Sequence, residues 1–101
     1  MMELKGSQRK YLRGLAHNLN PSALVGQKGL TDALMEEINM ALDASELIKV
    51  KFIDHKEKTL KMALVNEIAQ RTASHVAGMI GHVAVLYRAQ ADLQKRKIKL
   101  P

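Results

Sequence analysis

Residues 23–31 have the sequence ALVGQKGLT, and the rest of the chain can be interpreted outward from this stretch. Its first three residues are apolar, which is typical of a short buried strand. Gly26 and Gly29 then let the backbone turn sharply and approach a ligand without interference from a Cβ atom. Thr31 is a favourable N-cap, so we expect a helix to begin here and to run to about Ala44. The stretch therefore predicts a strand, a turn and a helix in direct succession.

The chain after this helix alternates between strand and helix patterns. Residues 47–53 alternate apolar and basic side chains, which is strand periodicity. A helical pattern follows over residues 57–73, and residues 75–88 have the alternation of a β-hairpin with a tight turn at Gly81-His82. The residues that we expect to face the core are Leu34, Ile38, Ala41 and Leu42 in the second helix, Ile48, Val50 and Phe52 in the strand, and Leu60, Leu64, Ile68 and Ala69 in the third helix.

The chain before the opening stretch predicts a first helix, from Ser7 to Leu19. Ser7 is a suitable N-cap, and Pro21 disfavours helical geometry at the residue that precedes it. The expected apolar stripe of this helix is Tyr11, Leu12, Leu15, Ala16 and Leu19.

The opposite side of the first helix is basic. Lys5, Arg9 and Arg13 are four residues apart, His17 continues the stripe, and Lys10 lies beside it. Like charges at this spacing repel one another, and no acidic residue on the helix offsets the repulsion. A solvated face that tolerates this cost is one interpretation. We favour the interpretation that this face binds phosphate groups.

The order of these elements predicts an α/β fold in which three helices pack on a four-stranded mixed sheet, in the order α-β-α-β-α-β-β. A chain of 101 residues is the size of one domain with a single core. We expect this domain to span residues 1–91. We expect the basic tail, residues 92–101, to be extended or loosely ordered.

The formal net charge is +6, and the charges are sorted along the chain. Residues 1–30 carry five basic groups and one acid, residues 31–47 carry five acids and no Lys or Arg, and residues 49–61 carry five lysines and two acids. Such sorting benefits a protein that turns one face toward a polyanion. A solvated lysine-rich surface would give the same total charge, so the charge indicates a class of partner without identifying it.

The turn Gly26-Gln27-Lys28-Gly29 is the best candidate for a binding site. The helix N-terminus after it offers free N–H groups and a positive dipole end, which suit a phosphate group, and Lys28 adds a charge at the tip. The G-x-x-G clamp of KH domains holds a sugar-phosphate backbone in this way. Two glycines between a strand and a helix can also form a simple turn. The G-x-x-x-x-G-K-[ST] and G-x-G-x-x-G motifs of nucleotide-cofactor loops are absent.

No group of residues in the sequence indicates catalysis, a metal site or a cofactor. The chain has no cysteine, and none of its four histidines lies in a zinc-binding motif. The adjacent Glu36 and Glu37 would point in different directions on a helix, and no serine has the context of a nucleophile elbow. We therefore expect a protein that is not an enzyme.

Aromatic residues are scarce, with only Tyr11, Phe52 and Tyr87 in the chain. We expect Tyr11 and Phe52 in the core. Tyr87 could lie in the core with its polar tip exposed or could contact a base, and we favour the core position, which leaves no aromatic side chain to stack on bases. Recognition of a nucleic acid would then rest mainly on its backbone and its shape.

The sequence shows no targeting segment or membrane span. Four basic residues lie within the first thirteen positions, and Gly, His or charged residues interrupt the longest apolar runs. We expect a cytoplasmic protein.

Three stretches of the sequence carry a resemblance to a known family. They are Leu12-Arg13-Gly14-Leu15-Ala16-His17 with Pro21 after it, Val25-Gly26-Gln27-Lys28-Gly29-Leu30-Thr31, and Ile80-Gly81-His82-Val83-Ala84-Val85-Leu86-Tyr87-Arg88. In this order and at this spacing they resemble the CRM domain (chloroplast RNA splicing and ribosome maturation), and most closely its bacterial stand-alone form, the YhbY family. The resemblance spans residues 4–88.

This resemblance implies a fold similar to the C-terminal domain of translation initiation factor three. It also implies RNA binding through the G-x-x-G loop and association with precursors of the large ribosomal subunit. Carried over to this chain, the loop is Gly26 to Gly29, and Arg88 closes the Leu-Tyr-Arg motif. Gln27 stands where many relatives have a basic residue, so the charge of the loop depends on Lys28.

Our main hypothesis is a monomeric RNA-binding module that assists assembly of the large ribosomal subunit without a cofactor. A rival hypothesis is a protein-interaction adaptor, whose basic face docks an acidic assembly partner and whose acidic helix is a second docking surface. A third is non-specific DNA binding. The expected RNA-binding residues are Gly26, Gln27, Lys28, Gly29, Lys5, Arg9, Lys10, Arg13 and, with the weakest support, Arg88.

Overall fold

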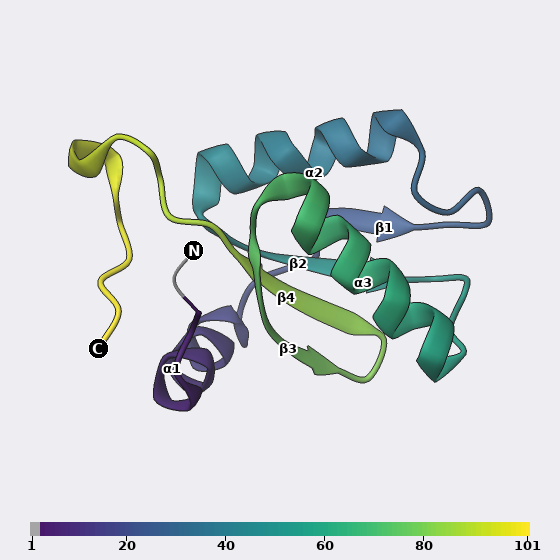
Figure 1. Ribbon diagram of the computed structural model, residues 1–101, viewed down its shortest axis with the longest axis horizontal. Helices are drawn as coiled ribbons and strands as arrows, with labels where there is room; N and C mark the ends of the chain where they lie inside the picture. The colour runs from purple at the N-terminus through teal and green to yellow at the C-terminus, as the bar shows by residue number, and fades with distance from the viewer. Residues whose placement is uncertain (1–2) are drawn as a thin grey trace.

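Four strands form one mixed sheet, with helix α1 on one face and helices α2 and α3 on the other (Figure 1). The computed structural model describes residues 3–101, so Met1 and Met2 of the predicted domain lie outside the described residues. The predicted α/β fold, with three helices and a mixed four-stranded sheet, is confirmed. The elements in chain order are α1 (Gly6–Ala16), β1 (Ala23–Val25), α2 (Asp32–Ser45), β2 (Leu47–Phe52), α3 (Lys58–Thr72), β3 (His75–Ile80), β4 (Val83–Tyr87) and the 3-10 helix η1 (Leu93–Lys95).

The strands lie in the order β1-β2-β4-β3, so the last strand along the chain is a central one. β1 is parallel to β2, and α2 forms the crossover between them. β4 is antiparallel to both of its neighbours. Its position explains why both of its faces are buried, with Leu86 in one core cluster and Val85 in the other.

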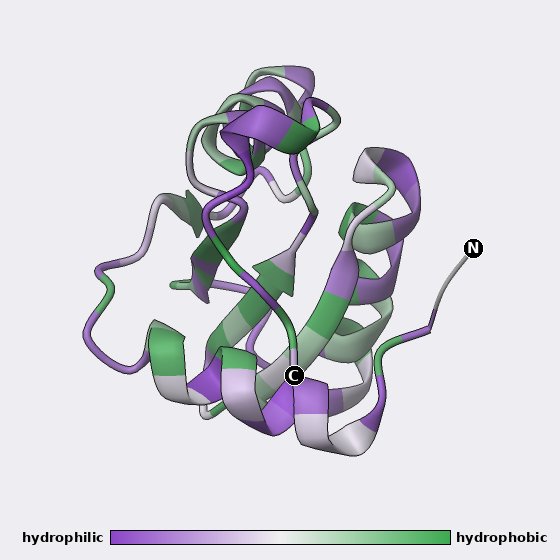
Figure 2. Ribbon diagram, turned by 90° about the vertical axis from the view of Figure 1, so that its left-hand side faces the viewer, coloured by the Kyte–Doolittle hydropathy of each residue, from purple (hydrophilic) through white to green (hydrophobic). Residues whose placement is uncertain are grey.

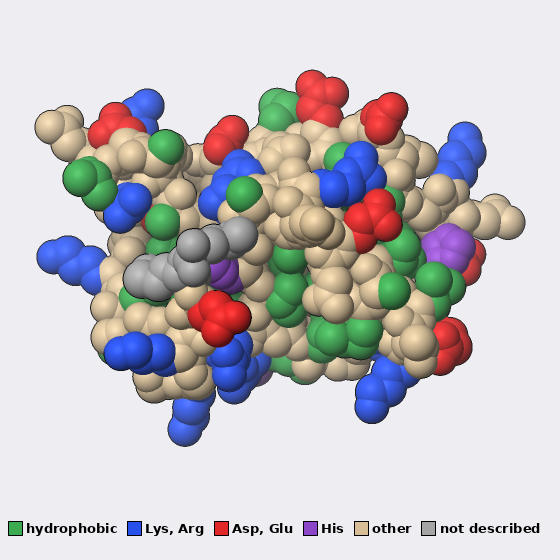
Figure 3. Space-filling view, viewed as in Figure 1, with side chains coloured by type: hydrophobic (Ala, Val, Ile, Leu, Met, Phe, Trp, Pro, Cys, Tyr) green, Lys and Arg blue, Asp and Glu red, His purple; other side chains and the backbone are tan. Residues whose placement is uncertain are grey.

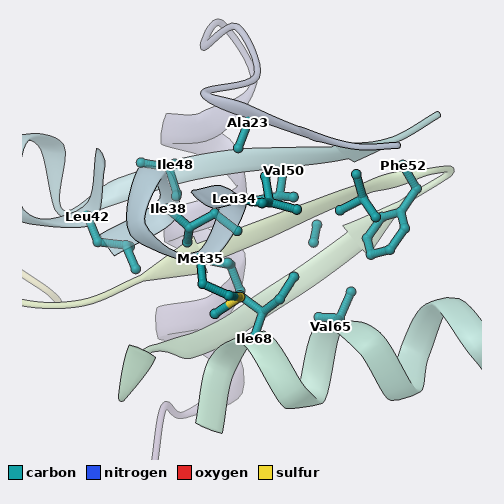
Figure 4. Packing of buried hydrophobic residues seen from close by; sticks show 13 residues of the cluster. Ala23, Leu34, Met35, Ile38, Leu42, Ile48, Val50, Phe52, Val65 and Ile68 are labelled. Atoms are coloured by element: carbon teal, nitrogen blue, oxygen red, sulfur yellow. The ribbon is translucent and has the colours of Figure 1, made fainter. Parts of the chain in front are cut away.

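The larger core cluster lies between the sheet and helices α2 and α3. Ile38 of α2, Ile68 of α3 and Phe52 of β2 are fully buried in it, and Figure 4 shows side chains from both helices directed toward the sheet. The predicted cap of α2 is confirmed, because Thr31 Oγ1 accepts a hydrogen bond from Leu34 N at 3.1 Å. This cap fixes where the helix begins after the glycine turn.

The second core cluster lies on the other face, where α1 crosses the sheet. Leu12 and Ala16 of α1 are fully buried there, and Val85 and Tyr87 of β4 meet them from the sheet. Figure 2 shows α1 running along the bottom of the molecule, with the C-terminus against it. A Gln8 Nε2 hydrogen bond to the Pro101 carbonyl oxygen, at 3.2 Å, joins the two.

The structure corrects both ends of the predicted first helix. Its N-cap is Lys5 rather than Ser7, and Gln8 Oε1 accepts a hydrogen bond from Lys5 N at 2.9 Å. The helix ends at Ala16 rather than at Leu19. The side chain of Gln8 therefore caps the N-terminus of α1, where the sequence had predicted a cap by Ser7.

The predicted apolar stripe of α1 is wrong in part. Tyr11 and Leu15 are each 41% exposed, because they lie on a flank of the helix and not on the narrow face that meets the sheet. Both line a shallow hollow that Pro101 also lines. Of the aromatic residues expected in the core, Phe52 and Tyr87 are buried and Tyr11 is not.

The predicted inward face of α3 is confirmed at Ile68 and in part at Leu64, and it is wrong in the first turn of the helix. Leu60 is 42% exposed, whereas Lys61, Val65 and Thr72 are buried with Ile68. Lys61 covers the core with its alkyl chain while its Nζ donates to the Gly81 carbonyl oxygen at 2.9 Å. A lysine in an inward position gives no apolar signal, so the sequence pattern favoured Leu60 over Lys61.

The C-terminal tail packs on the domain. Ile98 and Leu100 lie against the second core cluster beside Leu4. The backbone N–H groups of Lys97 and Ile98 donate to Glu46 Oε1 at 2.8 and 3.1 Å. The tail therefore covers the sheet near Tyr87, where β4 ends. Among the described residues, no helix has both the length and the apolar character needed to cross a membrane.

Candidate nucleic-acid interface

The turn between β1 and α2 is closed by its own backbone. Gly29 N donates to the Gly26 carbonyl oxygen at 3.0 Å, and Gly29 has a φ of +71°. This left-handed conformation favours glycine, since a Cβ atom would be strained in it. The conformation directs the chain into α2, whose N-terminus suits an anion.

Gly26 has a different role from Gly29. A Cβ atom at position 26 would lie 3.9 Å from Ile53 Cδ1, an ordinary contact, so packing within the protein does not require a glycine there. What a glycine provides at this position is backbone that a ligand can approach closely. Gln27 and Lys28 are exposed at the tip of the turn.

A neighbouring segment, residues 53–57, supports this turn. His55 Nε2 lies 3.0 Å from the Gln27 carbonyl oxygen, and the N–H groups of Ile53 and Asp54 both donate to the Val25 carbonyl oxygen. His55 itself has a left-handed φ of +55°. The two segments therefore form one surface, and they bring Lys56 next to the turn.

The tip of the β3–β4 hairpin adds further cations. Lys61 Nζ lies 3.2 Å from His82 Nδ1, and the His82 carbonyl oxygen accepts a hydrogen bond from Phe52 N at 2.7 Å. Burial and the positive charges of Lys61, Lys56 and Lys51 lower the pKa of His82. Three lysines thus act on one imidazole, and an anion at this place would relieve their repulsion.

Sequence reasoning missed Lys51, Lys56 and Lys61 as members of this surface. The signal was present, since five lysines lie within residues 49–61. The strand alternation showed that the Lys51 side chain points away from the core. It could not show that the hairpin tip and the glycine turn meet at the same end of the sheet. We call Lys28, Lys51, Lys56 and Lys61 the loop-end cations, and His82 lies among them.

The basic side chains predicted on α1 lie apart from the glycine turn. Figure 1 shows α1 toward the left of the molecule and the β1–α2 turn at its right-hand end. Arg13 is half-buried, and its Nη1 donates to the Ala77 carbonyl oxygen of β3 at 2.8 Å. Arg9 Nη1 donates to the Leu4 carbonyl oxygen at 2.8 Å, and Lys5 and Lys10 are exposed. The predicted basic residues therefore form two regions and not one.

Arg88 occupies a structural position. Its Nη1 donates to Asn39 Oδ1 and to the Thr72 carbonyl oxygen at 2.8 and 2.7 Å. Its Nη2 donates to the Asn39 carbonyl oxygen and to Asp43 Oδ1 at 3.0 and 2.8 Å. All four terminal N–H groups of the guanidinium thus bind within the protein, so we leave Arg88 out of the candidate interface.

The charges of the molecule differ between its two faces. In Figure 3, acidic side chains stand along the upper edge, over α2, and Lys and Arg side chains project from the lower edge. The acidic residues of α2 include Asp32, Glu36 and Glu37, on the face of the sheet opposite α1. Residues 3–101 contain no group of three side chains that could hold a metal ion.

Comparison with known proteins gives consistent matches over almost the whole chain. A family model described as "CRS1 / YhbY (CRM) domain" matches residues 4–88. An "RNA-binding protein" of Haemophilus influenzae is 41% identical over 101 residues, which cover 100% of this chain and 98% of that protein. The "Probable RNA-binding protein YqeI" of Bacillus subtilis is 34% identical over 98 residues, with 97% and 99% covered. The solution structure of a hypothetical protein from Staphylococcus aureus superposes with a TM-score of 0.81 at 33% identity, covering 97% of this chain and 99% of that one.

Proposed function

The chain belongs to the CRS1 / YhbY (CRM) domain family, and from this premise we propose that it binds RNA by holding the sugar-phosphate backbone at the Gly26–Gly29 turn. The resemblance stated from the sequence is thereby confirmed at the level of the family. The Haemophilus and Bacillus relatives bear names that describe RNA binding, which supports RNA as the ligand.

The observation that carries the proposal is the joining of a tight glycine turn to a group of cations. The turn offers open backbone and a helix N-terminus, both of which suit a phosphate group. Lys28 is at its tip, and the other loop-end cations lie on the segments beside it. Each phosphate that these residues neutralise should steepen the salt dependence of binding by about 0.7 to 0.9 log units of affinity per log unit of salt.

The RNA partner and the cellular location of the protein are further parts of what we propose. The family resemblance favours ribosomal RNA in precursors of the large ribosomal subunit, bound by a monomer in the cytoplasm. The protein would assist assembly by binding and not by catalysis. These points rest on the resemblance, whereas the mode of contact rests on the geometry of the turn.

The test is binding of labelled ribosomal RNA fragments to the purified protein at two salt concentrations. We expect Gly29→Asp to weaken binding strongly, because it adds a negative charge where a phosphate should lie. Gly29→Asn, which fits the left-handed conformation with the same shape and no charge, separates charge from backbone strain. Gln70→Glu places the same added charge on exposed α3 and should bind as wild type. Unchanged affinity in a folded Gly29→Asp protein would refute the proposal.

The adaptor hypothesis remains the rival from another class. Treating co-purified particles with RNase distinguishes the two, since an RNA tether releases the protein and a protein contact retains it. Competition between structured RNA and duplex DNA at physiological salt tests the third hypothesis. Equal competition by DNA would point to non-specific binding of polyanions.

A further inference from the structure

One strip of the sheet is left uncovered, and its side chains are aligned in register. Leu24 of β1 pairs with Lys51 of β2, and Lys51 pairs with Val83 of β4. Val83 in turn pairs with Ile80 of β3. We call these four residues the sheet row. Leu24 and Ile80 are 51% and 53% exposed, Lys51 is exposed and Val83 is half-buried.

The sheet row belongs to the same face as α1. Successive residues of a strand point to opposite faces. Val25, Val50 and Ala84, each next to a member of the row, belong to the cluster beneath α2 and α3. Val85, two positions along β4 from Val83, lies under α1. The helix therefore covers one part of this face and leaves the sheet row open beside it.

A basic flank of α1 borders the sheet row. Arg13 lies over Gly78, two residues before Ile80, and a Cβ atom at position 78 would come within 2.6 Å of Arg13 Cδ. The opposite flank of α1 carries Tyr11 and faces the C-terminal tail through the hollow that Pro101 lines. Arg9 and Arg13 share a flank because they are four residues apart, so that flank faces the open strip.

The glycine turn borders the sheet row at its other side. Leu24 is two residues before Gly26 along the chain. Ile53, 51% exposed, has its Cδ1 3.9 Å from the place of a Cβ atom at Gly26. Exposed aliphatic surface thus runs from the α1 flank to the turn, and Lys51 stands in the middle of it.

We propose that the sheet row receives unpaired bases of a single-stranded RNA segment, whose phosphates bind the α1 flank on one side and Lys28 and Lys56 beside the glycine turn on the other. This inference rests on the proposed function and names the class of RNA that the same surface prefers. Unstacked bases can lie against aliphatic side chains, whereas the bases of a duplex are stacked and inaccessible. The arrangement explains why basic side chains border the sheet row both at α1 and at the glycine turn.

RNA fits this strip better than a protein partner does. Four side chains offer far less surface than the about 800 Å² per partner that a stable protein interface buries. The charged side chains that the sheet itself presents on this face, Lys49 and Lys51, are both basic. Isolated exposed apolar residues are common on protein surfaces, but here they are in register and lie between two groups of cations.

The experiment compares a labelled single-stranded RNA with a perfect duplex of the same sequence. The variant carries Leu24→Thr and Ile80→Thr, which keep strand propensity and remove apolar surface. Met40→Gln is the control, since Met40 is 65% exposed on α2 at the other face. We expect the double variant to lose about tenfold in affinity for the single strand. Its affinity for the duplex and its salt dependence should not change, because no charge is removed.

The inference would be overturned if the double variant bound the single strand with wild-type affinity, or if Met40→Gln lost as much affinity as the double variant. It would also be overturned if the wild-type protein bound the duplex more tightly than the single strand. Loss of a co-purifying protein from RNase-treated extract, with RNA affinity unchanged, would assign the strip to a protein partner instead. Measuring each substitution singly, with thermal unfolding alongside, guards against a fold defect in the double variant. Lys28→Ala tests the proposed function separately, since it should weaken binding of both RNAs whatever happens at the strip.

Discussion

Glu46 shows how one buried carboxylate joins distant parts of the chain. It is 2% exposed at the end of α2, where it has a φ of +63°. The backbone N–H groups of Gln90, Lys97 and Ile98 donate to its two oxygens at 2.7 to 3.1 Å. Burial by itself would raise the pKa of Glu46, but these hydrogen bonds and the charge of Arg96 outweigh it and lower the pKa.

We predict that Glu46→Gln lowers the free energy of unfolding by about 1–3 kcal/mol, because an amide nitrogen cannot accept the N–H groups that the carboxylate accepts. The folded pKa lies below the ordinary value, so the contribution of Glu46 is fully present above that value. It is lost as the pH falls through the folded pKa. Urea unfolding at neutral and acidic pH measures both effects, with exposed Glu37→Gln as the control. A variant as stable as wild type at neutral pH would contradict this role.

His82 provides a pH-dependent signal of binding. Burial and the three neighbouring lysines lower its pKa in the free protein. A phosphate group among the loop-end cations would raise that pKa, so binding should take up a proton and tighten as the pH falls toward the His82 pKa. NMR titration of the imidazole with and without RNA would show the shift, and His82→Asn should lose the pH dependence. An identical titration in both states would place the RNA elsewhere.

At the scale of the secondary-structure elements, Arg88 is the main polar link between the helices and the sheet. It follows β4 directly, and its guanidinium binds Asn39 and Asp43 of α2 and the carbonyl oxygen of Thr72 at the end of α3. A planar fork with fixed N–H directions can satisfy these acceptors together, whereas an ammonium group cannot. The link holds the layer of α2 and α3 in place.

We predict that Arg88→Lys lowers the free energy of unfolding by about 1–3 kcal/mol and leaves the RNA affinity of the folded protein within about twofold of wild type. Arg71→Lys is the matched control. Arg71 is an exposed residue of α3 whose ion pairs with Asp32 and Glu67 lie at the surface and should contribute about 0–1 kcal/mol. Denaturant unfolding and RNA binding of the same samples would measure both quantities. A stable Arg88→Lys protein with weakened RNA binding would restore Arg88 to the interface.

The elements that the sequence predicted well are those with a local signal. The glycine turn, the Thr31 cap and the hairpin at Gly81 each depend on residues a few positions apart in the sequence. All three are present as expected. The prediction for α3 was wrong in its first turn, where Lys61 is buried instead of Leu60, because only the hairpin tip makes that position favourable for a lysine. The prediction for Tyr11 was wrong because the face of α1 that meets the sheet is narrow, and its width depends on strands that are distant in sequence.

At the scale of the whole molecule, acidic and basic side chains are separated across the sheet, and the segments that carry the loop-end cations meet at one end. The acidic helix α2 lies on one face, and Lys and Arg side chains project from the lower edge in Figure 3. The β1–α2 turn, the loop after β2 and the β3–β4 hairpin tip lie toward the right-hand end in Figure 1. The sequence showed that the charges were sorted, but the strand order decides which of them meet. Lys28 is far from Lys51 and Lys56 in the chain and shares a surface with them because β1 and β2 are neighbours in the sheet and His55 contacts the glycine turn.

A pair of charge reversals tests this separation. Lys56→Glu and Lys95→Glu change the net charge equally, but residue 56 lies beside the glycine turn and residue 95 in η1 at the opposite end (Figure 1). We predict that Lys56→Glu weakens RNA binding by about tenfold or more and reduces the salt slope by about 0.7 to 0.9, as for one lost phosphate contact. Lys95→Glu should change both quantities little. Equal effects would mean that only the total charge matters.

The central position of β4 also has a consequence for the order of folding. The β3–β4 hairpin closes across a two-residue turn and can form in about 1–10 μs. β2 can pair with β4 only after α3 and β3 have been brought around, so this contact is distant in sequence and should limit the folding rate. β1, with three residues at the edge, can add only to a β2 that is already in place. We therefore expect substitutions in the β2–β4 pairing to slow folding and substitutions in β1 mainly to speed unfolding.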